Sequence, residues 1–280
     1  MRSTPFRKLT LCLFALLAVS MAVQAQAQTV FHYNYSATLL PDIFDVGGVG
    51  NNATAGPLAV ISTDIPTVGV FPTAGLHSLD SSDQTAIRAN QAGAVTTAVS
   101  LLTNDLIAAA GGFTYETWFK WNGAGGVNSI IDYAGTDKLV IDQRNGASTT
   151  LAMRMDPNDL VIGEAIPGQW QYVAFVFDTN GNAVDAGTIT GTATAYLDGL
   201  DPINLGTATK SNFGDSLVRP IGIGQHPIGF DLDFFDGSVF ETRVSLGALS
   251  PGELLYTVPE PSCGVTLLIG AVLLGFRKRR

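Results

Sequence analysis

The chain has 280 residues, of which 46% are hydrophobic and only 14% are charged. It can therefore form one or two folded domains and lacks the composition of a disordered protein. Its net charge of −9 and its isoelectric point near 4.6 argue against nucleic acid as a partner. Two cysteines can build neither a disulfide framework nor a multi-cysteine zinc site.

The first 27 residues have the organisation of a secretory signal peptide. Three basic residues precede a mostly apolar stretch at residues 9–23, and Ala25 and Ala27 form an A-x-A cleavage site. We therefore predict export, with cleavage by signal peptidase after Ala25 or Ala27. The alternative is an uncleaved N-terminal membrane anchor, which the short apolar stretch and its small, polar end disfavour.

Residues 28–74 form a turn-rich segment that contains four prolines and a glycine-rich run at residues 45–52. The glycines do not form a nucleotide-binding loop, because no strand–GxxxxGK–helix context surrounds them. We expect this segment to wrap around the folded domain and to contribute one edge strand at residues 30–35.

The middle of the chain consists of short apolar runs separated by turn residues, which predicts an all-β sandwich or barrel. Predicted strands cover residues 113–121, 129–133, 138–141, 170–177, 192–197 and 238–244. Turns are expected at residues 178–182, where Asn and Gly tolerate left-handed backbone, and at residues 198–199. Residues 101–110 are a candidate helix or a loop with one helical turn.

Five sequence blocks resemble, in order, the motifs of laminin-G-like domains. They read GLHSLDSSDQTAIRA from residue 75, FTYETWFKW from residue 113, GQWQYVAFVFD from residue 168, ATAYLDG from residue 193, and IGIGQ followed by FDGSVFETRVSLGALSPGEL within residues 221–254. The resemblance implies a concanavalin A-like jelly roll, in which two antiparallel sheets pack face to face. We assign residues 75–257 to this domain.

The last 23 residues combine a Pro-Glu-Pro motif, an apolar run at residues 264–276 and a basic end. The motif is Val258, Pro259, Glu260 and Pro261, and the basic tail is Arg277, Lys278, Arg279 and Arg280. This order resembles the PEP-CTERM sorting signal of Gram-negative bacteria that make extracellular polysaccharide. It implies processing by an exosortase and a short C-terminal transmembrane sorting helix, with transient or permanent membrane contact. The alternative is an ordinary short anchor, since 13 apolar residues are fewer than the roughly 20 of a stable span.

Loss of both ends would change the charge of the protein. Residues 28–259 would keep 8 basic and 23 acidic residues and no cysteine, which gives a net charge of about −15. Such a surface repels nucleic acid and anionic lipid headgroups. The expected partners are extracellular polysaccharide or a surface protein.

Two groups of oxygen-bearing side chains are candidates for Ca²⁺, the one cofactor the sequence suggests, because this ion takes roughly six to eight oxygen ligands. The first group is Asp178, Asn180 and Asn182, and the second is Asp231, Asp233, Asp236 and Glu241. A hairpin turn is the favoured interpretation of the first group, because Ala183 and Ile189 stand where an EF-hand needs Gly and Glu. In the second group Phe240 replaces the aspartate that is often a calcium ligand in laminin-G-like domains.

Sugar binding requires exposed aromatic rings beside polar side chains. Trp118 and Trp170 match family positions that look like core. Trp121, Tyr133 and Tyr172 are therefore the candidates for glycan contact.

Catalysis by glycan hydrolysis requires two facing carboxylates, about 5–5.5 Å apart in retaining enzymes. The sequence offers only the Asp231-Leu-Asp233 pair and the isolated Glu116 and Glu241. We predict a non-catalytic surface or matrix protein with adhesive contacts to polysaccharide or protein. A glycan-active enzyme on the same fold and a purely structural matrix component are the alternatives.

Overall fold

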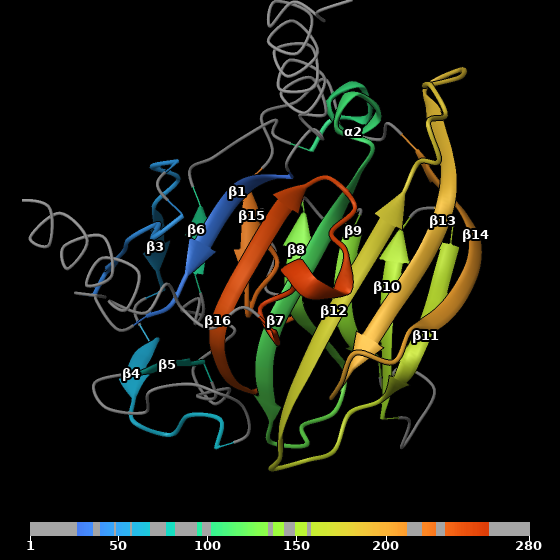
Figure 1. Ribbon diagram of the computed structural model, residues 1–280. Coiled ribbons are helices and arrows are strands. Elements are labelled where there is room, and N and C mark those ends of the chain that lie inside the picture. Colours follow the sequence, from blue (N-terminus) through green and yellow to red (C-terminus); the bar gives the residue numbers. More distant parts are fainter. Residues whose placement is uncertain are drawn as a thin grey trace, which may run out of the picture.

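The structure is a computed structural model of the chain, and two antiparallel sheets packed face to face dominate it (Figure 1). It describes residues 27–35, 40–47, 49–56, 58–67, 77–81, 94–96, 102–133, 137–142, 149–155, 158–211, 220–227 and 233–257. The predicted signal peptide except Ala27, the sorting tail and Asp231 lie outside these residues. Within the described part of the chain, no helix is long and apolar enough to span a membrane.

The front sheet has the strand order β14-β13-β12-β7-β16-β5-β4, and β1 also pairs with β16. Its strands are β1 (Gln28–Tyr33), β4 (Val60–Ser62), β5 (Ser78–Asp80), β7 (Gly112–Trp121), β12 (Trp170–Asp178), β13 (Thr188–Leu197), β14 (Ile203–Ser211) and β16 (Gly237–Leu246). The four long strands predicted at residues 113–121, 170–177, 192–197 and 238–244 are β7, β12, β13 and β16, so the predicted all-β sandwich is confirmed.

The back sheet has the order β11-β10-β9-β8-β15-β6-β3-β2. Its strands are β2 (Asp42–Ile43), β3 (Ala53–Ala55), β6 (Ala94–Thr96), β8 (Val127–Tyr133), β9 (Asp137–Asp142), β10 (Thr150–Met155), β11 (Asn158–Glu164) and β15 (Ile221–Ile223). The segment 28–74 therefore supplies strands to both sheets and is part of the sandwich, and its predicted edge strand is β1.

The main core fills the space between the two sheets. Along β7, Phe113, Tyr115, Phe119 and Trp121 face this core, because successive side chains of a strand alternate between its two faces. The candidate helix at residues 101–110 is confirmed as α2 (Asn104–Ala110). The Thr103 hydroxyl caps its N-terminus, and Gly111 ends it with a φ of 81°.

A second apolar cluster lies on the outer face of the front sheet. Its members are Trp118, Tyr172, Ala174, Val176, Tyr196, Phe240, Leu249, Leu254 and Leu255. Residues 248–257, which we call the C-terminal strap, cover part of this face and include the 3₁₀ turn η1 (Pro251–Glu253). The ring of Tyr256 stacks on Trp118 with 5.7 Å between centroids. The strap thus shields apolar side chains that the sandwich alone would leave in water.

Candidate functional site

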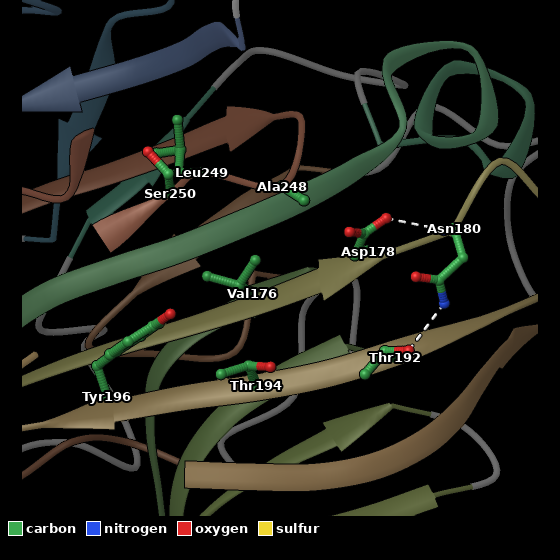
Figure 2. A pocket seen from close by; sticks show the side chains of 9 residues that line it. All are labelled: Val176, Asp178, Asn180, Thr192, Thr194, Tyr196, Ala248, Leu249 and Ser250. Atoms are coloured by element: carbon green, nitrogen blue, oxygen red, sulfur yellow. Dashed lines mark hydrogen bonds between the residues drawn. The ribbon is translucent and has the colours of Figure 1, made fainter. Parts of the chain in front are cut away.

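An open cleft of about 360 Å³ lies on the outer face of the front sheet, where β12 and β13 meet the strap. Its lining residues are Val176, Asp178, Asn180, Thr192, Thr194, Tyr196, Ala248, Leu249 and Ser250 (Figure 2). The lining therefore combines a carboxylate, an amide, several hydroxyls and one aromatic ring. These groups can hydrogen-bond sugar hydroxyls and contact an apolar sugar face.

The polar end of the cleft is built by the turn between β12 and β13. Asn180 and Gly181 have φ values of 54° and 76°, and the Asn182 N–H donates to the Thr179 carbonyl at 2.9 Å. This is a type I′ turn, which favours an Asn-Gly pair. The Asn180 N–H donates to Asp178 Oδ1 at 2.7 Å, and its side-chain amide donates to Thr192 Oγ1 at 2.8 Å. The turn predicted at residues 178–182 is confirmed, and it fixes Asp178 and Asn180 at the rim of the cleft.

Tyr196 forms the aromatic part of the lining. Only 6% of the residue is exposed, and it packs in the second apolar cluster. No described residue forms a hydrogen bond with its hydroxyl, which Figure 2 shows directed toward Val176. Burial raises the pKa of this phenol. The hydroxyl is not among the buried oxygens that lack a partner, so it reaches the surface of the cleft and is free to hydrogen-bond a ligand there.

Glu116 holds the strap that forms the opposite wall. Its Oε1 accepts a hydrogen bond from Arg243 Nε at 2.6 Å and forms an ion pair with Arg243 Nη2 at 2.6 Å. Its Oε2 accepts from the Tyr172 hydroxyl at 2.7 Å and from the Leu255 N–H at 2.6 Å. Burial raises the pKa of Glu116, and the Arg243 guanidinium opposes that shift. These three hydrogen bonds and the ion pair hold the strap against β7, so Glu116 has a positioning role in the fold.

The predicted calcium residues of the second group make three separate sets of contacts. Asp233 pairs with Lys138 at 2.6 Å, Asp236 accepts from the Asn122 amide at 3.3 Å, and Glu241 contacts His32 Nε2 at 3.0 Å. Among the described residues, no group of three or more His, Cys, Asp or Glu side chains could hold a metal ion. Asp233, Asp236 and Glu241 thus do not converge on one point, and Asp231, the fourth member of the group, lies outside the described residues.

The three aromatic residues predicted for glycan contact lie in the interior. Trp121 and Tyr133 are 1% exposed in the main core, and Tyr172 is fully buried beneath the strap. The prediction was wrong for these residues, because alternation along a strand does not reveal what covers each face. Trp118 is buried as expected, whereas Trp170 is only half-buried and donates to Asp64.

Tyr196 is the ring that sequence reasoning missed. The run Thr192-Ala-Thr-Ala-Tyr196 places it on the same strand face as Thr192 and Thr194. This alternation was a usable signal, since it predicts one aromatic ring on a hydroxyl-rich face.

A family model described as Laminin_G_3, concanavalin A-like lectin/glucanases superfamily, matches residues 91–255, which is more than half of the chain. The chain belongs to this superfamily. The match extends from the strand β6 to the strap and so includes every residue of the cleft. No curated protein matches the sequence.

Solved structures are similar to this chain at low sequence identity. Trypanosoma rangeli sialidase in complex with 2,3-difluoro-KDN is 14% identical, with a TM-score of 0.51, and the match covers 81% of this chain and 31% of the sialidase. The binding domain of botulinum neurotoxin DC in complex with rat synaptotagmin II is 12% identical, with a TM-score of 0.43. The match covers 81% of this chain and 50% of the neurotoxin chain. This chain thus matches half or less of either protein's length.

Proposed function

We propose that this protein is a non-catalytic carbohydrate-binding module that acts as an adhesive component outside the cell. The observation that carries the proposal is the cleft at Tyr196, in a superfamily described as lectins and glucanases. Its ring packs in the apolar cluster and its hydroxyl lacks a protein partner, while Asp178, Asn180 and Thr192 supply further polar groups nearby. This combination of apolar and polar groups suits sugar recognition.

The carboxylates of the described residues favour binding over hydrolysis. Hydrolysis needs two carboxyl groups across the scissile bond, whereas Asp178 is the single carboxylate among the residues that line the cleft. Glu116 is neutralised by Arg243, and Glu241 is engaged by His32. We therefore assign no catalytic residue.

The proposed location follows from the two ends of the sequence. A signal peptide would export the chain, and the Pro-Glu-Pro tail would bring it to an exosortase-type enzyme for delivery to the surface or matrix of a Gram-negative cell. Mapping of the C-terminal peptide by mass spectrometry tests this part. A terminus close to Pro261 supports sorting, whereas an intact Arg280 in the mature protein contradicts removal of the tail.

A glycan array probed with the purified protein and two matched variants tests the binding proposal. Tyr196→Phe removes the cleft hydroxyl and keeps the ring, and we expect its signals to fall about tenfold, the effect of one lost hydrogen bond of roughly 1.4 kcal/mol. Tyr115→Phe removes a buried hydroxyl between the two sheets, which also lacks a hydrogen-bond partner, and should bind like the wild type. Absence of any reproducible glycan signal for the wild type would refute the function.

A further inference from the structure

The cleft continues into an array of small polar side chains on β13 and β14, whose register shifts once, between Ala193 and Thr194. Directly paired positions are Thr188 with Ser211, Thr190 with Thr209, Thr192 with Thr207, and Thr194 with Asn204. We call these eight residues the hydroxyl ladder. The side chains between them on β13 are Ile189, Ala193 and Ala195, which are buried, so the ladder occupies the outward face.

The ladder is open to solvent and internally ordered. Thr190, Asn204 and Thr207 are exposed, and the other five members are half-buried. The hydroxyls of Thr190 and Thr209 lie 3.1 Å apart across the two strands. Each threonine hydroxyl can donate one hydrogen bond and accept others, as sugar hydroxyls do.

The dimensions of this surface exceed those of one sugar. From Thr188 to Tyr196 the strand β13 rises about 26 Å, at roughly 3.3 Å per residue. The cleft occupies the part of this length from Thr192 to Tyr196. A ligand that used the cleft and the remaining ladder would therefore be a chain of several sugars.

The charge of this surface selects among polysaccharides. Asp178 is the single charged residue among those that line the cleft, and it is acidic. Lys210 on β14 points inward, where it is 2% exposed and its ammonium donates to Asn104 Oδ1 at 2.9 Å. No cation of the cleft or the ladder is thus available to a carboxylate or sulfate, and the net charge of −9 opposes polyanions.

We infer that the cleft and the hydroxyl ladder together bind an extended, neutral polysaccharide along β13. The inference rests on the proposed function and names its ligand class. The Tyr196 hydroxyl provides a hydrogen bond at the cleft, on a ring that the second apolar cluster holds in place. The ladder provides repeated weaker contacts, so affinity should rise with the number of sugar units until the ladder is filled.

The test uses the full chain and two kinds of soluble polymer. A neutral β-glucan and dextran serve as neutral probes, and alginate serves as the anionic probe, with binding followed by affinity gel electrophoresis and calorimetry. Thr192→Val with Thr207→Val removes two facing hydroxyls while keeping β-branched side chains suited to strands. Thr54→Val makes the same exchange at an exposed position of β3 in the back sheet and is the matched control.

The expected result is binding of a neutral polymer, tighter for longer oligosaccharides of that polymer. The double variant should bind at least tenfold more weakly, and Thr54→Val should bind as the wild type does. Binding of alginate alone, or neutral binding that the double variant retains, overturns this inference and leaves the carbohydrate-binding function standing. If neither class of polysaccharide nor any arrayed glycan binds, the proposed function itself fails.

Discussion

Replacing Arg243 with methionine should destabilise this protein strongly, because the change leaves a fully buried carboxylate without its counter-charge. Glu116 is 0% exposed, and Arg243 is its ion-pair partner and donates one of its three hydrogen bonds. Removal of one partner from a buried ion pair costs about 3–5 kcal/mol. At roughly 2–4 °C per kcal/mol for a domain of this size, the melting temperature should fall by roughly 6–20 °C.

The reciprocal variant should be milder. Glu116→Gln keeps acceptors for the Tyr172 hydroxyl and the Leu255 N–H and removes the charge whose burial is costly. Arg243 would retain its bond to the Glu253 carbonyl and some contact with water. The double variant should therefore lose less than the sum of the two single variants, by about 2 kcal/mol.

Urea denaturation of the wild type, both single variants and the double variant measures this double-mutant cycle. Hydrogen exchange at Leu254 and Leu255 adds a local readout, because the strap should open before the sandwich unfolds. Additive losses, or a cost below about 1 kcal/mol for Arg243→Met, would refute the reasoning that the pair fastens the strap.

Two further predictions concern the strand spacing and the strap turn. Gly191→Ala should unfold the domain or abolish soluble expression, because a Cβ at this position would lie 2.1 Å from the Asp178 carbonyl oxygen. Gly252→Ala is the control and should express normally, because a Cβ at position 252 would have no atom within 4 Å. Hydrogen bonds from Ser250 lower the pKa of Glu253. The ionised Glu253 carboxylate therefore stabilises the fold above the usual carboxyl pKa, and this stabilisation is lost as the pH falls through the lowered pKa of the folded protein. The difference in unfolding free energy between the wild type and Glu253→Gln should accordingly shrink between about pH 5 and pH 3 in urea titrations; a constant difference would contradict this assignment.

The long strands β7, β12, β13 and β16 were predictable from the sequence because their side chains alternate and their ends carry turn residues, whereas β10, β11 and β14 were not predicted. β12 ends at Asp178 before an Asn-Gly turn, and β13 ends before Asp198, which has a φ of 53°. The short strands β2 and β3 were not predicted. Strands of two or three residues carry too few alternating positions to distinguish them from loops.

The candidate site was predictable only in part. Asp178 and Asn180 were singled out for their oxygen atoms, and they do lie at the cleft. The cleft itself arises because Leu249 and Ser250 come to lie beside β12 and β13, a contact between segments more than 50 residues apart in the sequence. The same strap buries Tyr172, so one tertiary contact both created the site and removed a predicted sugar platform.

The contacts between Glu116 and the strap also determine how the domain would bear mechanical load. Leu254 and Leu255 are buried, and the Leu255 N–H is bound to the central strand β7, so a pull applied at Thr257 reaches the middle of the front sheet first. At the other end, Gln28 of β1 pairs with Leu246 of β16, so tension on the N-terminus reaches that strand as well. Because Gln28 and Leu246 lie at the same end of this antiparallel pair, tension between the two ends would open β1 from β16 at that end once the Glu116 contacts break, and it would not act first on the outermost strand β14.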